Sequence, residues 1–211
     1  MITEKTTIIE LATIVSEALE RAGIISTLSG GAAVSIYSNE VYESEDLDFV
    51  TAARINDLKE ALEPLGFHHT GNPRLPVFEH PQTRWYLEFP PAPLGFGGTY
   101  VDPSECSLVD AGIGELRIIT PTHSIMDRLI AAATWSEPQS LDQALLVAEH
   151  QVKKIDWPAI DKWVIKEGIA GDKEVIDFYR KISRHLPTDS AQYDTIMVMA
   201  PFLLTLFCGL S

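Results

Sequence analysis

The stretch from Leu28 to Val50, LSGGAAVSIYSNEVYESEDLDFV, contains the features that decide the fold. A glycine pair, Gly30 and Gly31, follows a short apolar run. A spacer of fourteen residues then separates this pair from an Asp-x-Asp motif formed by Asp46 and Asp48. The order of these features predicts a strand, a glycine turn, a short helix, a polar loop and a second strand.

The Asp-x-Asp motif predicts a pair of carboxylates on one face of a strand. Residues at i and i+2 of a strand point to the same side, so Asp46 and Asp48 project together while Leu47 and Phe49 enter the core. Two neighbouring carboxylates repel and raise each other's pKa unless a cation lies between them. Mg²⁺ prefers such oxygen ligands. The alternative is a solvated strand edge or turn, which the polar residues just before the motif would suit.

The glycine pair predicts a phosphate site next to these carboxylates. Glycine lets backbone N–H groups approach a ligand closely, and a helix that begins there adds its positive end. A glycine pair taken alone is usually only a turn, so this prediction depends on the motif that follows it.

Together the two motifs resemble those of the nucleotidyltransferase superfamily, in which an apolar residue, Gly-Gly or Gly-Ser, a spacer and Asp-apolar-Asp follow one another. More narrowly, the chain resembles the abortive-infection toxin type, the AbiEii-like nucleotidyltransferases. The matching positions are Gly30, Gly31, Ser44, Asp46 and Asp48. Tyr42 stands where that group often has an arginine. The resemblance covers residues from about 24 to 165 and implies that Gly30, Gly31 and Ser44 contact a nucleoside triphosphate.

The first part of the chain is expected to be an α/β (α+β) domain, a nucleotidyltransferase-like mixed sheet with helices. Periodicity predicts helices at 7–22, 32–37 and 55–65, and strands at 24–28, 46–50, 77–78, 84–89 and 116–119. In the strand 84–89, Glu88 shares a face with Tyr86, opposite three large apolar side chains. We therefore expect Glu88 to be a third carboxylate of the site; the alternative is an ion pair with Arg84 or another cation.

From residue 120 onward the pattern is helical, with expected helices at 122–135, 140–150, 157–167 and 172–185. The sequence therefore predicts a nucleotidyltransferase-like domain at 1–120 and a helical bundle at 121–211. By the resemblance, Arg128 would contact the triphosphate and Asp142 would orient it or the acceptor. The alternative is that Asp127, Arg128 and Asp142 form structural ion pairs between neighbouring helices.

The resemblance implies a Mg²⁺-dependent enzyme that transfers a nucleoside monophosphate from a nucleoside triphosphate to an acceptor hydroxyl. Asp46, Asp48 and Glu88 would hold two Mg²⁺ ions about 3.5–4 Å apart. It also implies the toxin of a toxin–antitoxin or phage-defence pair, with an antitoxin as partner. The acceptor stays open between tRNA, protein and a small molecule.

Two other function classes also stay open. One is a non-catalytic nucleotide-binding or interaction module that keeps the fold; it predicts that Glu88 does not face the two aspartates, or that the cleft is blocked. The other is a structural partner without a nucleotide site.

The overall charge limits the choice of partners. The chain has 211 residues, with 16 Lys and Arg against 30 Asp and Glu, and a net charge of −14. This balance works against broad attraction to nucleic acid, which depends on neutralising phosphates. Two distant cysteines, Cys106 and Cys208, and the absence of a signal-peptide pattern predict a cytoplasmic protein.

The C-terminal residues 195–211 are almost wholly apolar. They are short for a membrane span, which needs about 20 residues. The sequence therefore favours a buried core helix or a homodimer contact over a membrane anchor.

Overall fold

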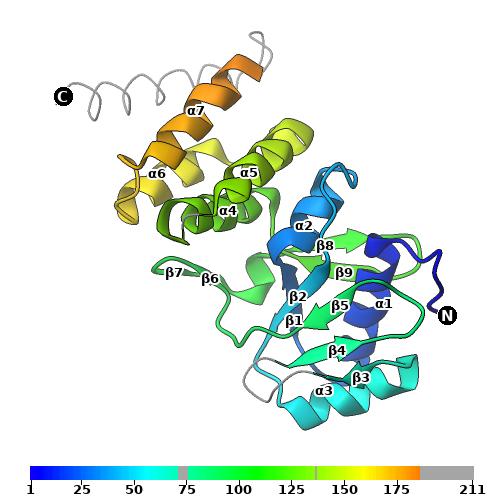
Figure 1. The fold of residues 1–211 in the computed structure, drawn as a ribbon. Helices are drawn as coiled ribbons and strands as arrows, with labels where there is room; N and C mark the ends of the chain where they lie inside the picture. The colour runs from blue at the N-terminus through cyan, green and yellow to red at the C-terminus, as the bar shows by residue number, and fades with distance from the viewer. Residues whose placement is uncertain (71–75, 136, 186–211) are drawn as a thin grey trace. The chain divides into compact units, whose positions relative to one another are not determined.

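The computed structural model describes residues 1–70, 76–135 and 137–185 (Figure 1). These residues fall into two compact units. The first comprises residues 1–36, 40–95 and 100–120, and the second comprises 37–39, 96–99 and the described residues from Pro121 onward. The two short pieces 37–39 and 96–99 therefore pack with the helices. The division into functional domains at residue 120 stays a prediction, and the apolar residues 195–211 lie outside the described part.

The first unit contains a mixed seven-stranded sheet with the strand order β3-β4-β5-β2-β1-β9-β8. Its strands are β1 (Ser26–Ser29), β2 (Asp46–Thr51), β3 (His68–His69), β4 (Val77–Glu79), β5 (Tyr86–Glu88), β8 (Ser107–Asp110) and β9 (Glu115–Ile118). The pairs β1–β9 and β2–β5 are parallel, whereas β1–β2, β3–β4, β4–β5 and β8–β9 are antiparallel. The prediction of a mixed sheet with helices is therefore confirmed.

Helices α1 (Ile8–Arg21), α2 (Gly30–Tyr37) and α3 (Ile55–Leu62) accompany this sheet, as Figure 1 shows. Short 3₁₀ turns follow at Glu63–Leu65 and Pro103–Glu105. Helix α1 begins with a capping box, in which Thr7 and Glu10 satisfy each other's backbone N–H groups. Its apolar stripe, including Leu11, Val15 and Leu19, is fully buried, and the helix packs beside β1 and β9.

Half-buried and buried residues alternate along strand β2, as its sequence predicts. Leu47 and Phe49 are fully buried, whereas Asp46 and Asp48 are half-buried. Removing the two apolar side chains from water stabilises this register, because a slip by one residue would bury the carboxylates instead. The core packing of Leu47 and Phe49 thus determines which way the carboxylates point.

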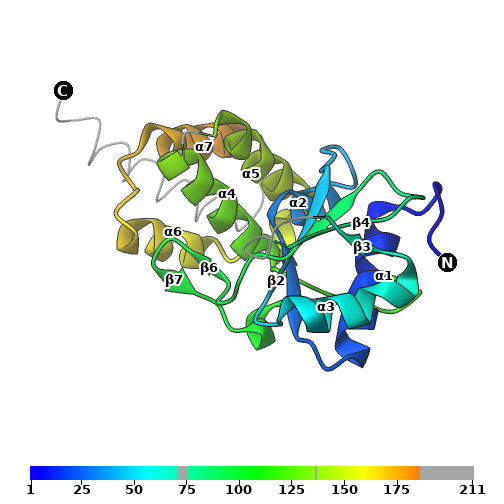
Figure 2. The ribbon, with the colours of Figure 1, turned by 60° about the horizontal axis from the view of Figure 1, so that its bottom comes forward.

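The second unit consists mainly of helices α4 (Pro121–Trp135), α5 (Pro138–Gln151), α6 (Trp157–Lys166) and α7 (Lys173–His185) (Figure 2). A 3₁₀ turn at Val152–Lys154 follows α5. Helix α4 packs against α5, α6 and α7, so the predicted helices do form a bundle. Among the described residues, no helix is both long and apolar enough to cross a membrane.

Several short strands were not expected from the sequence. Strand β8 pairs only with β9 and forms one edge of the sheet. Its residues are half-buried or exposed, so the apolar signal is weak. A two-stranded ribbon, β6 (Gly95–Phe96) with β7 (Thr99–Tyr100), lies in and just after a segment rich in glycine and proline. Such short pairs are formed by tertiary contacts and have almost no periodicity of their own.

Candidate active site

Three carboxylates meet on neighbouring strands of the sheet. The parallel pairing of β2 with β5 sets Asp48 opposite Glu88, and directly paired residues point to the same face. One carboxylate oxygen from each of Asp46, Asp48 and Glu88 lies within 4.8 Å of the others. The expectation of the non-catalytic alternative that Glu88 does not face the aspartates is therefore wrong, whereas the metal-binding role of the three acids stays a prediction.

The electrostatics of this cluster favour a cation. Burial raises the pKa of the Glu88 carboxyl, and the charge of Asp46 raises it further. The pKa of the neighbouring Tyr86 is also raised, first by burial and then by the surrounding carboxylates, with Asp46 contributing most. In both groups burial raises the pKa most, and the neighbouring carboxylates raise it further. An oxygen-only, half-buried donor set of this kind fits a hard divalent cation such as Mg²⁺.

Arg84 does not neutralise Glu88. Its guanidinium forms an ion pair with Glu43 across 3.0 Å and lies over the ring of Trp85 at 4.8 Å from the ring centre. Arg84, one possible partner of Glu88 in the alternative to a catalytic role, therefore pairs instead with Glu43 in the loop before β2.

The glycine pair lies directly beside the carboxylates. Gly30, the first residue of α2, follows β1 and has a φ of +64°, and a Cβ atom at this position would overlap the Asp48 carboxylate. A Cβ at Gly31 would come within 2.7 Å of the Ser44 hydroxyl. Both glycines thus have a steric reason to be glycine, since only a missing side chain allows this approach. Their predicted contact with a triphosphate stays a prediction.

Ser44 has its polar groups engaged within the protein. Its hydroxyl donates a hydrogen bond of 2.9 Å to Oδ1 of Asp46. Its backbone N–H donates to the Ser35 hydroxyl, and its carbonyl accepts from the indole N–H of Trp85, both at 2.9 Å. Sequence reasoning missed Ser35 and Trp85, because the tryptophan pattern indicates only core packing and its partner lies 41 residues away.

The two residues predicted from the helical motifs have partners within the second unit. The guanidinium of Arg128 donates to Asp127, at 2.7 and 3.1 Å, and to the side-chain oxygen of Gln143 on α5 at 3.1 Å. The exposed Asp142 forms an ion pair with Lys181 on α7 across 3.5 Å. Arg128 thus pairs with Asp127 of its own helix, whereas the ion pair of Asp142 joins α5 to α7. The triphosphate roles of Arg128 and Asp142 stay predictions.

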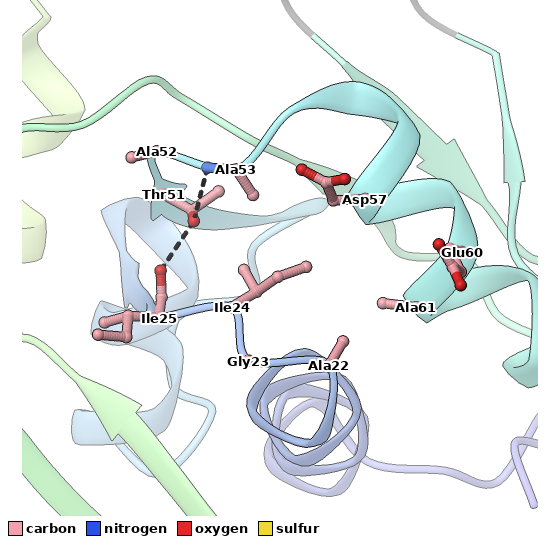
Figure 3. A pocket seen from close by; sticks show the side chains of 10 residues that line it. All are labelled: Ala22, Gly23, Ile24, Ile25, Thr51, Ala52, Ala53, Asp57, Glu60 and Ala61. Atoms are coloured by element: carbon pink, nitrogen blue, oxygen red, sulfur yellow. Dashed lines mark hydrogen bonds between the residues drawn. The ribbon is translucent and has the colours of Figure 1, made fainter.

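A cavity of about 530 Å³ lies at the other end of β1 and β2 from the carboxylates (Figure 3). It is lined by Ala22, Gly23, Ile24, Ile25, Thr51, Ala52, Ala53, Asp57, Glu60 and Ala61. The Thr51 hydroxyl donates to the carbonyl of Ile25 and accepts from the N–H of Ala53, which ties the strand ends together. None of the predicted site residues lines this cavity, so its volume does not identify the carboxylate site.

Comparison with known proteins finds solved structures that resemble this one. No protein-family model matches the sequence, and no curated protein does. A nucleotidyltransferase-like antigenic protein from Paracoccidioides brasiliensis matches with a TM-score of 0.51 at 12% identity, over 70% of this chain and 78% of that one. JHP933 from Helicobacter pylori matches with a TM-score of 0.49 at 16% identity, over 92% and 89%. ANT(2″)-Ia in complex with adenylyl-2″-tobramycin matches with a TM-score of 0.47 at 17% identity, over 67% and 87%.

The sheet order and the first of these matches define the class of the fold. The chain has a nucleotidyltransferase-like fold. At such low identities the likeness concerns the fold, and the chemistry has to be argued from the residues of the site itself.

Proposed function

We propose that this chain is a divalent-metal-dependent nucleotidyltransferase, which transfers a nucleoside monophosphate from a nucleoside triphosphate to an acceptor hydroxyl. The observation that carries the proposal is the cluster of Asp46, Asp48 and Glu88, with carboxylate oxygens within 4.8 Å of one another. The nucleotidyltransferase-like fold supports it, as does the glycine pair that lies against Asp48.

The proposed mechanism uses two Mg²⁺ ions, which would be held by Asp46, Asp48 and Glu88. When bound, Mg²⁺ supplies stabilisation of the negative charge that develops on the phosphoryl oxygens and the leaving pyrophosphate. The oxygen of the acceptor hydroxyl forms a bond to the α-phosphorus as the bond to pyrophosphate breaks, and the hydroxyl proton passes to water. Enzymes achieve such transfers mainly by positioning and electrostatics.

The chain's own residues would bind and orient the triphosphate. Gly30 and Gly31 are buried beside Asp48 and Ser44. The proposal places a phosphate at the start of α2 because the N–H groups and the dipole of a helix start favour an anion. Arg128 and Asp142 belong to the proposal by the sequence resemblance alone, with Arg128 as the triphosphate contact and Asp142 orienting the triphosphate or the acceptor.

The finer parts of the proposal are the acceptor and the biological role. The resemblance to AbiEii-like proteins supports a toxin of a toxin–antitoxin or phage-defence pair, with an antitoxin partner. The net charge of −14 favours a protein or small-molecule acceptor over nucleic acid, unless a local basic patch is present.

The proposal is tested by thermal unfolding with each of the four Mg–nucleoside triphosphates. A ligand that binds the folded state stabilises it by about 2.7 kcal/mol at a hundredfold excess over Kd. A Mg²⁺-dependent rise in Tm is expected for the wild type and for Glu115→Gln, an exposed acid on β9, and is lost in Asp48→Asn. Transfer of label from an α-phosphate-labelled triphosphate to extract fractions then identifies the acceptor. A wild type that responds to none of the four contradicts the proposal.

A further inference from the structure

Ser44 is fixed in place by two different parts of the first unit. Its N–H group donates to Ser35 on α2, and its carbonyl accepts from Trp85 next to β5. The residue is 4% exposed. Its backbone is thus held from both sides, which fixes the Cα–Cβ bond that carries the hydroxyl beside Asp46.

Asp46 needs such a fixed donor. Three carboxylate oxygens within 4.8 Å of one another repel, and an aspartate at the start of β2 has a rotatable side chain that can turn away. The Ser44 hydroxyl donates to Asp46 Oδ1 at 2.9 Å. A hydrogen bond to an ionised carboxylate is stronger than one between neutral groups, so this contact opposes the rotation.

Gly31 leaves room for this hydroxyl. A Cβ at Gly31 would lie 2.7 Å from the Ser44 oxygen and 3.2 Å from the Tyr42 hydroxyl oxygen. Any side chain at Gly31 would therefore displace Ser44 or Tyr42. The glycine pair thus makes room for two groups of the site. Gly30 lies against the Asp48 carboxylate, and Gly31 lies against the Ser44 hydroxyl.

We propose that Ser44 is a positioning residue that holds the Asp46 carboxylate in place as a ligand for a divalent cation, while Ser35 and Trp85 hold Ser44. This inference rests on the metal site of the proposed function. It also assigns the Ser44 hydroxyl a role different from the predicted triphosphate contact, because its single proton is donated to Asp46 and cannot be donated to a phosphate at the same time.

The first test is the affinity of the full chain for Mn²⁺, measured by electron paramagnetic resonance without any nucleotide. Residues that orient a metal ligand typically contribute about ten- to hundredfold to metal affinity, and Ser44→Ala is expected to lose this amount. Thr13→Val is the matched control: it removes a buried hydroxyl on α1 that donates to the carbonyl of Ile9 in its own helix. Its Mn²⁺ affinity should equal that of the wild type.

A second test asks whether Ser44 acts through Asp46. In the metal-free protein, Ser44→Ala should lower the urea midpoint of the wild type. It should leave the midpoint of Asp46→Ala unchanged, because no carboxylate is left to position. Equal shifts in the two backgrounds would mean that Ser44 has only a general packing role, and this would overturn the proposal.

The possible results separate this inference from the proposed function. Mn²⁺ binding by the wild type that Ser44→Ala leaves intact overturns the positioning role alone. A wild type that binds no Mn²⁺ overturns the metal site and the positioning role together. If Ser44→Ala does not fold, Ser44→Cys replaces it in both tests, because the thiol has a similar size but is only a weak donor. The same loss of affinity is expected.

Discussion

Two aspartates in this protein accept a hydrogen bond from a side-chain hydroxyl, in very different surroundings. Asp46, on β2, accepts from Ser44 at 2.9 Å. Asp161, on α6, accepts from Tyr179 on α7 at 2.6 Å. Asp161 and Tyr179 are only 6% and 1% exposed, whereas Asp46 is half-buried and shares its surroundings with two further carboxylates.

This difference separates a structural hydrogen bond from a candidate cation site. Burial raises the pKa of the Asp161 carboxyl, and the Tyr179 hydroxyl opposes the rise. That one donor compensates one buried acceptor, as a packed helical core requires. On β2 and β5, Ser44 donates to Asp46, which belongs to a group of three acids with carboxylate oxygens within 4.8 Å of one another. Three half-buried carboxylates close together, with access for solvent, are the feature that points to a metal.

Replacing Asp48 by Asn is expected to have the largest effect. If the metal supplies several kcal/mol of transition-state stabilisation, nucleotidyl transfer should fall by about a hundred- to a thousandfold. The urea midpoint of the metal-free protein should stay the same or rise, because one of three repelling charges is removed. Labelled-triphosphate assays and urea unfolding measure the two effects, with Glu115→Gln as the control. A large loss of stability would mean that Asp48 has a structural role, as Asp161 does.

Replacing Gly30 by Ala should destabilise the fold by more than about 2 kcal/mol and weaken Mn²⁺ binding, because a positive φ costs about 1–2 kcal/mol and the new Cβ would also meet Asp48. Gly112→Ala is the matched control, since Gly112 has a φ of +76° and no atom within 4 Å of the added Cβ. Urea unfolding of both variants separates the backbone strain from the contact with Asp48. Equal losses would mean that the contact with Asp48 contributes nothing.

Replacing Tyr179 by Phe should destabilise the fold by about 1–3 kcal/mol, since a buried acceptor loses its donor. In contrast to the Asp48 variant, the affinity for Mn²⁺ should not change. Tyr100→Phe is the control, because Tyr100 is well exposed. A Tyr179→Phe protein as stable as the wild type would show that the bond to Asp161 makes no net contribution.

The smallest effect expected is a change in the pH dependence of stability in Asp161→Asn. Because the pKa of Asp161 is raised in the folded state, the folded protein binds more protons than the unfolded chain between the two pKa values. Stability therefore falls as the pH rises through that range. Asn removes this titration and keeps an acceptor for Tyr179, so the decline should disappear. Urea midpoints measured from acid to neutral pH check this, and an unchanged decline would assign it to other groups.

Much of the fold could be predicted because its signals are local. The capping box of Thr7 and Glu10, the alternation from Asp46 to Phe49 and the helical periodicity after residue 120 each depend on neighbouring residues. Strand β8 and the ribbon β6–β7 could not be predicted, since they are too short to show a period and are formed by their partners.

For the candidate site, the sequence by itself determined that two carboxylates share a face of one strand beside a glycine pair, because the strand period is a property of the chain. Only the tertiary structure decided that Glu88 joins them, since the parallel register of β2 and β5 joins segments 40 residues apart. It also decided that Ser44 donates to Asp46 and that Trp85 and Ser35 hold Ser44. Such contacts depend on the packing of distant segments, so a local sequence pattern cannot predict them.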